Sequence, residues 1–227
     1  MNLESFEDRI GTSFKNKKLL EEALTHRSYL NEIAGVGKKH NERLEFLGDA
    51  VLELIVTEDL FGRFPDKEEG ELTVLRAALV NSKMLSLAAN KIGLTESILM
   101  SRGEAKESYQ TRAREKISAN AMEALIGAIY LDAGYGASKK FIDEFIMSFL
   151  DGAIKEAKDA KSMVQEIIQS EFKLTPTYKV LEESGPAHDR TFKVGLYIGD
   201  EMQTEALGKS KQEAEIEAAR AWLESRG

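Results

Sequence analysis

Three acidic residues in one short segment have the spacing that a cation-dependent hydrolase needs. Glu42, Glu45 and Asp49 lie in the run NERLEFLGDAV, residues 41–51. If this run is helical, positions i, i+3 and i+7 share one face, so the three carboxylates form a stripe. Such a stripe repels itself unless it is solvated or bridged by cations. The spacing alone therefore allows two interpretations, a solvated acidic surface or a cation site.

A second polar pair lies in the most apolar part of the chain. Asn120 and Glu123 are one helical turn apart and are followed by the run ALIGAIYL. A glutamate among apolar neighbours needs a partner when it is buried, either an arginine or a cation. Oxygen donors without cysteine or nearby histidine favour a hard cation such as Mg²⁺ or Mn²⁺. If the two predicted helices pack face to face, their side-chain oxygens could hold one or two cations that support phosphodiester hydrolysis.

Composition limits the function classes further. The chain has 227 residues, with 31 Lys and Arg against 39 Asp and Glu, which gives a net charge of −8. The absence of cysteine excludes disulfides, thiolate metal sites and cysteine nucleophiles. We expect no membrane span, because no apolar run reaches about 18 residues, and no signal peptide. The expected location is the cytoplasm, and the net acidity argues mildly against general nucleic-acid binding.

The first 150 or so residues are expected to be helical. Apolar residues recur at helical spacing from about Asn41 to the Phe64-Pro65 pair, over 72–92, over 111–133 and over 141–157. A loop is expected over 103–110, where the apolar pattern stops.

The pattern changes after residue 158. A short helix is predicted at 162–172, then three segments that alternate apolar and polar residues at 177–185, 191–199 and 201–208, then a closing helix. This order, α-β-β-β-α, is typical of a small α+β domain. The chain is therefore predicted to be mainly α, with domains at 1–150 and 159–227. The charged, Ala-rich segment 151–158 between them is interpreted as a linker or a helix tail.

Four segments resemble one protein family. NERLEFLGDAV closely resembles the signature of the ribonuclease III family, without a gap. Further matches are ALTHRSY at 23–29, EGELTVLRAALVN at 69–81 and MEALIGAIYLDAGY at 122–135. The α+β tail resembles a double-stranded RNA-binding domain. The resemblance covers nearly the whole chain, in the bacterial domain order.

The resemblance implies a ribonuclease III, a homodimeric endonuclease that cleaves double-stranded RNA with Mg²⁺, for which Mn²⁺ could substitute, and with no organic cofactor. Its products would carry 5′-phosphates and short 3′ overhangs, and its substrates would be ribosomal and other RNA precursors. Phe46 would lie near the subunit interface. Carried over by position, the metal set is Glu45, Asp49, Asn120 and Glu123, with Asp49 and Glu123 catalytic and with Glu42 and Glu69 in the same acidic valley.

One position departs from the family pattern. Asn120 stands where the family usually has Asp, and an amide keeps one oxygen ligand but loses a negative charge. Three interpretations remain: a nuclease that tolerates a neutral ligand, a change introduced to silence the enzyme, or a double-stranded RNA-binding regulator that cuts weakly or not at all.

The resemblance also implies RNA contacts in the tail. Gln165 and Glu166 would face 2′-hydroxyls from an exposed helix, and His188 would enter a minor groove from a loop. Lys209 and Lys211 would hold phosphates at the start of the last helix. Residues 159–227 carry nine basic and thirteen acidic side chains, a net charge of −4, so binding should depend on this local patch and on salt.

Overall fold

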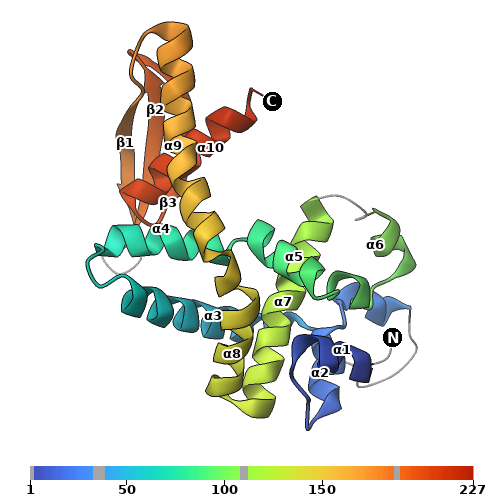
Figure 1. Cartoon of the computed structure of the whole chain (residues 1–227). Coiled ribbons are helices and arrows are strands. Elements are labelled where there is room, and N and C mark those ends of the chain that lie inside the picture. Colours follow the sequence, from blue (N-terminus) through green and yellow to red (C-terminus); the bar gives the residue numbers. More distant parts are fainter. Residues whose placement is uncertain (1–2, 33–38, 108–111, 187–189, 227) are drawn as a thin grey trace. The chain divides into compact units, whose positions relative to one another are not determined.

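The structure is a computed structural model, and it describes residues 3–32, 39–107, 112–186 and 190–226. Contacts divide the chain into two units (Figure 1). The first comprises Met1–Asp59 with Leu79–Phe149, and the second comprises Leu60–Ala78 with Leu150–Gly227.

The first unit is helical throughout its described residues. Its elements are α1 (Leu3–Ile10), α2 (Lys17–Ala23), η1 (Arg27–Asn31), α3 (Glu42–Arg63, whose last turn falls in the second unit), α5 (Ser82–Lys91), η2 (Thr95–Ser97), α6 (Arg102–Glu107), α7 (Arg112–Ala133), α8 (Tyr135–Phe145) and η3 (Met147–Phe149).

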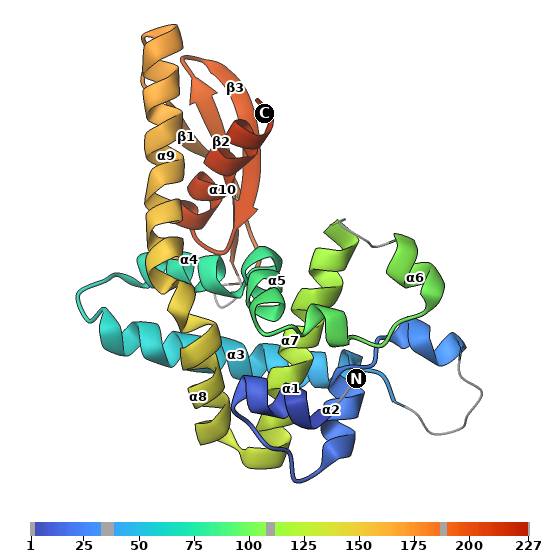
Figure 2. The same cartoon turned by 45° about the vertical axis from the view of Figure 1, so that its right-hand side comes forward.

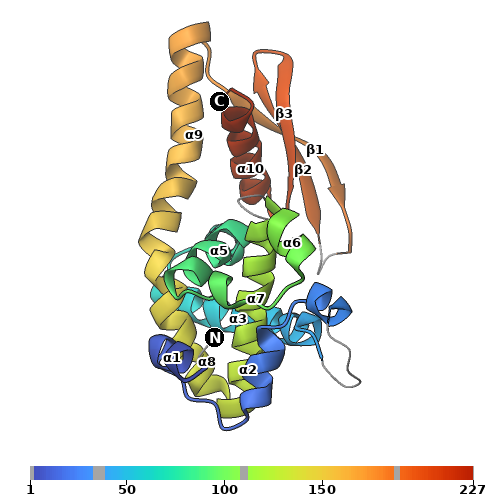
Figure 3. The ribbon, with the colours of Figure 1, turned by 90° about the vertical axis from the view of Figure 1, so that its right-hand side faces the viewer.

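Helix α7 is the centre of this unit. It packs against α2, α5 and α8, and Figures 2 and 3 show it running between them. Met122, Leu125, Ile126 and Ile129 are completely buried, as expected for a helix that is apolar on most sides. The few polar residues on α7 therefore lie against protein or on a narrow open face.

The crossing of α3 and α7 depends on two glycines. A Cβ placed on Gly48 would lie 1.7 Å from the carbonyl oxygen of Glu123, and one on Gly127 would lie 2.3 Å from the carbonyl oxygen of Leu44. Both contacts are with backbone, which cannot rotate away. Only glycine allows the two helices to approach this closely.

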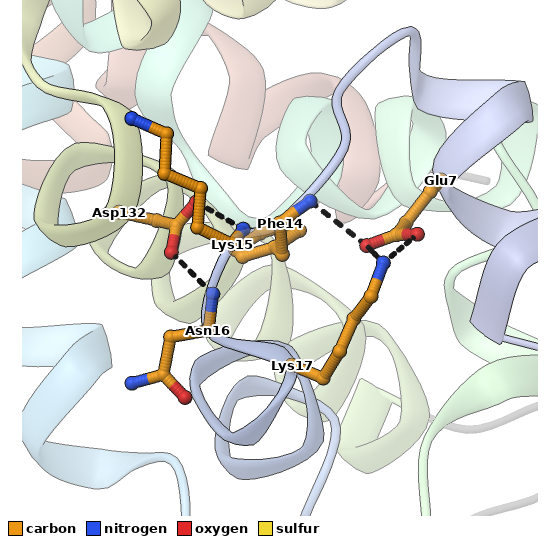
Figure 4. A network of polar contacts seen from close by, with 6 residues as sticks. All are labelled: Glu7, Phe14, Lys15, Asn16, Lys17 and Asp132. Atoms are coloured by element: carbon orange, nitrogen blue, oxygen red, sulfur yellow. Dashed lines mark hydrogen bonds and ion pairs between the residues drawn. The ribbon is translucent and has the colours of Figure 1, made fainter.

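Polar contacts fix the N-terminal helices against the end of α7 (Figure 4). The carboxylate of Asp132 accepts hydrogen bonds from the backbone N–H groups of Lys15 and Asn16, both at 2.8 Å. Glu7 is 5% exposed and forms an ion pair with Lys17, which satisfies its buried charge. The turn between α1 and α2 is thus held at both sides.

Two local expectations need correction or refinement. Residues 102–107, expected within or beside a loop, form the helix α6, because Ser101 Oγ accepts the N–H of Glu104 at 3.1 Å and caps it. Residues 108–110 of the same expected loop lie outside the described residues. The apolar run over 72–92 divides into two helices, because Asn81 Oδ1 accepts the N–H of Met84 and starts α5.

The second unit contains α4 (Glu69–Val80), α9 (Leu150–Phe172), β1 (Thr177–Ser184), β2 (Thr191–Ile198), β3 (Glu201–Gly208) and α10 (Lys211–Glu224). The strands form an antiparallel sheet in the order β1-β2-β3, and α9 and α10 lie on the same side of it (Figure 3). Val164, Leu196 and Trp222 meet in the core between sheet and helices. The predicted α-β-β-β-α order is confirmed.

The expected linker is helical. Residues 151–158 lie within α9, which begins at Leu150 rather than at 162, so the helix-tail interpretation of this segment is correct. Within the described ranges no single helix is long and apolar enough to span a membrane, although α4 and α5 pass that test as a bent pair.

The glycine crossing predicts a large difference between two alanine substitutions in α3. Gly48→Ala should destabilise the protein by about 3 kcal/mol or more, because its methyl group overlaps the α7 backbone. Gly62→Ala meets nothing within 4 Å and should be neutral or stabilising by up to about 1 kcal/mol. Urea unfolding of both variants measures this, and equal stabilities would contradict the close crossing.

Candidate functional site

Helices α3 and α7 bring the predicted acidic residues together. Glu45 and Asp49 lie on the face of α3 beside the crossing, and Asn120 and Glu123 lie on the facing part of α7. The side chains of Glu45, Asn120 and Glu123 are half-buried, whereas Asp49 is exposed. The predicted face-to-face packing of these two helices is therefore present.

The start of α3 is anchored by a residue that the sequence reasoning did not single out. Asn41 is 2% exposed; its N–H donates to the carbonyl of Thr25 at 2.9 Å and its carbonyl accepts from Glu45 N at 2.8 Å. Its side-chain amide donates to the carbonyl of Ala23 at 3.4 Å. Its position immediately before the predicted helix was the available signal.

Glu45 is hydrogen-bonded to Asn120, the residue that departs from the family pattern. The Asn120 amide donates a hydrogen bond to the Glu45 carboxylate. Burial raises the pKa of Glu45, and the charges of Glu42 and Asp49 raise it further; the Asn120 bond and the Lys116 charge oppose this. The net pKa is above the ordinary value, so burial and the neighbouring acids outweigh the Asn120 bond and the Lys116 charge.

Glu123 is the most perturbed acid of the group. Burial, followed by the charges of Asp49, Glu45 and Glu53, raises its pKa to about 8. A half-buried carboxyl that three other carboxylates repel is a strong signal of a functional site. Glu53 was not predicted, although it continues the stripe one turn beyond Asp49 on α3.

The two outer acids behave differently. Glu42 is exposed and lies 3.4 Å from Arg27 Nη1 and 3.7 Å from His40 Nδ1. Glu69 starts α4 in the second unit, where its carboxylate accepts a hydrogen bond from Thr73 Oγ1 at 3.1 Å. Its membership of the acidic valley stays a prediction.

Across the described part of the chain, no three or more Asp, Glu, His or Cys side chains converge closely enough to enclose a metal ion. The carboxylates of α3 and α7 approach one another without meeting at a point, as like charges do. The predicted ligand set Glu45, Asp49, Asn120 and Glu123 stays a prediction.

The second unit presents the predicted RNA-contacting residues on its surface. Gln165 and Glu166 are exposed on α9, and Lys209 and Lys211 are exposed at the start of α10. The Lys211 ammonium lies 5.5 Å from the ring centre of Phe192 on β2. His188 lies outside the described residues.

The start of α10 is a capped helix end. Ser210 Oγ accepts the N–H of Glu213 at 3.1 Å, and the Glu213 carboxylate accepts the N–H of Lys209 at 2.6 Å. The cap fixes the backbone that carries both lysines. The adjacent glutamate reduces their combined positive potential.

Known families match both parts of the chain. The family model described as Ribonuclease-III-like matches residues 16–150, and the one described as Double-stranded RNA binding motif matches residues 160–225.

Individual relatives match over almost the full length. Ribonuclease 3 of Borreliella burgdorferi is 42% identical over 98% of this chain and 91% of its own length. Ribonuclease 3 of Oleidesulfovibrio alaskensis is 45% identical over 97% of this chain and 96% of its own length. A solved nuclease domain of ribonuclease III from Campylobacter jejuni aligns with a TM-score of 0.58 and 42% identity, over 65% of this chain and 97% of that domain.

The raised pKa of Glu123 predicts a pH-dependent gain in stability for Glu123→Gln. The folded state holds the Glu123 proton more tightly than the unfolded state does, so parent stability falls as the pH rises from about 4.5 to about 8. In EDTA at pH 7.5 the variant should be more stable by about 1–3 kcal/mol, and at pH 4.5 it should equal the parent.

Denaturant unfolding at both pH values measures this gain. Glu96→Gln, at an exposed glutamate of η2, is the control and should leave stability unchanged. A Glu123→Gln variant that follows the parent at every pH would contradict the raised pKa.

Proposed function

Because this chain belongs to the ribonuclease III family, we propose that it is a divalent-cation-dependent endoribonuclease that hydrolyses phosphodiester bonds of double-stranded RNA in the cytoplasm. The observation that carries the proposal is the pairing of α3 and α7 at Gly48, which sets Glu123 among other carboxylates and raises its pKa to about 8. The products would carry 5′-phosphates and short 3′ overhangs, and ribosomal and other RNA precursors would be the substrates.

The donor set fits a hard cation. Glu45, Asp49 and Glu123 offer carboxylate oxygens and Asn120 offers one amide oxygen, the ligands that Mg²⁺ and Mn²⁺ prefer. Burial, and then the neighbouring carboxylates, raise the pKa values of Glu45 and Glu123, and a bound cation would offset both effects. A bound Mg²⁺ would supply Lewis acidity at the scissile phosphate and lower the pKa of the attacking water.

The side chains of the chain itself set the conditions for that chemistry. Asn120 donates a hydrogen bond to the Glu45 carboxylate through its amide, and Asp49 is exposed to solvent. Glu123, with a pKa near 8, carries a proton at neutral pH in the metal-free protein and must release it to become a ligand. Cation binding at this site is therefore proposed to release a proton.

The second unit is proposed to hold the duplex. Gln165 and Glu166 on α9 would meet 2′-hydroxyls, and Lys209 and Lys211 would meet phosphates, as in the sequence-based prediction. The exposure of all four side chains and the capped start of α10 support this assignment.

We also propose that the enzyme is a homodimer that covers the outer face of α3. Phe46 is 82% exposed and Leu54 is 59% exposed on that face, large apolar areas for a soluble protein. The related nuclease domain from Campylobacter jejuni has structural flexibility in a region involved in dimer formation.

A charge at Phe46 tests the dimer. Phe46→Glu should halve the mass seen by light scattering, whereas Leu87→Glu, at a 46% exposed position of α5, should leave the mass unchanged. A parent chain that is monomeric at all concentrations would contradict the dimer.

A second candidate function is a double-stranded RNA-binding regulator that cleaves weakly or not at all. The observation that favours it concerns Asn120. Its amide donates a hydrogen bond to the Glu45 carboxylate and brings no negative charge to the site. The two candidates differ only in whether the acidic residues of α3 and α7 bind a cation strongly enough to support RNA cleavage.

Cleavage of a labelled RNA duplex under Mg²⁺ and Mn²⁺ titration separates them. If the parent is a nuclease, Asn120→Asp should cut with a half-saturating Mg²⁺ concentration lower by about tenfold, because it adds a charge to the ligand set. Glu123→Gln should lower cleavage by at least about 100-fold while keeping duplex binding. Cutting by Asn120→Asp alone would mean that the parent is a silenced enzyme or an RNA-binding regulator, and no cutting by either form would refute the proposed site.

A further inference from the structure

Lys116 shares the helix face that carries the acidic site. It precedes Asn120 by four residues and Glu123 by seven, so the three side chains lie along one side of α7. Its side chain is exposed, which leaves the ammonium group in contact with solvent. Neither the predicted ligand set nor the predicted RNA contacts include it.

The Lys116 charge reaches the site. It lowers the pKa of the Glu45 carboxyl, against the combined effect of burial and the neighbouring acids. Lys116 forms no ion pair within 4 Å in the portion of the chain that the structure describes. The ammonium is therefore near the acidic group without being neutralised by one partner.

A nearby cation on the same helix has a different role. Arg114 donates to the carbonyl of Thr95 at 2.7 Å and contacts the sulfur of Met100, so it fastens η2 and the segment that follows it. Among the described residues, Lys116 has no such structural bond. Its charge is available for a ligand, whereas that of Arg114 is committed to the fold.

A lysine beside a divalent-cation site weakens cation binding by repulsion, and here it adds to the neutral Asn120. The ligand that gains from such a lysine is the other component of the proposed reaction, a polyanionic RNA backbone. We propose that Lys116 binds a backbone phosphate of the duplex at the edge of the acidic site and so sets the register of the scissile bond. This inference rests on the proposed function.

A phosphate contact at Lys116 would couple the affinity for the cation to the affinity for the RNA duplex. A phosphate on Lys116 neutralises the charge that repels the cation, so duplex binding raises cation affinity, and cation binding raises duplex affinity by the same factor. The lysine that weakens the empty site thus makes cation binding depend on the presence of substrate.

The test uses the full-length protein and three variants: Lys116→Gln, Lys116→Arg, and Lys140→Gln as a matched change at an exposed lysine of α8. Duplex affinity is measured in EDTA over a range of KCl concentrations. Lys116→Gln should weaken duplex binding by about three- to tenfold and lower the salt slope by about 1, and Lys116→Arg should restore both. Lys140→Gln should match the parent.

Cation binding is measured without RNA, as the shift of the melting temperature under Mg²⁺ titration. Lys116→Gln should bind Mg²⁺ about two- to threefold more tightly than the parent, the opposite direction from its effect on RNA. If Lys116 only stabilised the fold, its substitution would weaken the binding of both ligands and lower the melting temperature of the metal-free protein.

Two outcomes overturn the inference: an unchanged duplex affinity and salt slope in Lys116→Gln, or a loss that Lys116→Arg does not restore. Both are measured in EDTA, so they are independent of cleavage. Failure of the parent to cut RNA with Mg²⁺ or Mn²⁺ would instead count against the proposed function and leave the binding result to be judged separately.

Discussion

The close crossing of α3 and α7 is the constraint on which the candidate site depends. At Gly48 the backbone of α3 lies directly against the carbonyl of Glu123, and at Gly127 the backbone of α7 lies against that of Leu44. Helices with ordinary side chains at a contact stay about 8–10 Å apart between axes, so glycine at both positions brings the flanking side chains closer together. The distance between the two rows of oxygen-bearing side chains is thus set by the absence of two methyl groups.

This approach has an electrostatic cost that the core must offset. Glu123, set among the carboxylates of Glu45, Asp49 and Glu53, reaches a pKa of about 8. The same helix buries Met122, Leu125 and Ile126 completely, and each such side chain contributes about 1.5–3 kcal/mol. Helix α7, whose apolar side chains are largely buried, therefore carries the acid with the most strongly raised pKa among the described residues.

Sequence periodicity predicted which residues share a face but not which faces meet. The stripe of Glu42, Glu45 and Asp49 followed from a period of 3.6, whereas its pairing with Glu123 was only a conditional inference until the family resemblance supported it. Gly48 and Gly127 lie within the matched motifs, yet their physical role could not be predicted, because a close approach involves two helices and is invisible in either alone. Helix caps also could not be predicted from the periodicity. The Ser101 cap, for example, starts α6 where a loop was expected.

Positive charge is sparse at the positions where this chain would meet RNA. The first turn of α10 carries Lys211 beside Gln212, and Glu215 in the next turn forms an ion pair with Lys161 at 2.6 Å. The candidate acidic site likewise has a neutral amide at Asn120 and a single nearby lysine charge, that of Lys116, acting on Glu45 among the described residues. Few phosphate contacts would release few counterions, so we expect a low non-specific affinity for nucleic acid at physiological salt. On that expectation, stable binding would require several weak contacts at once, so a longer duplex should bind more tightly than a short one.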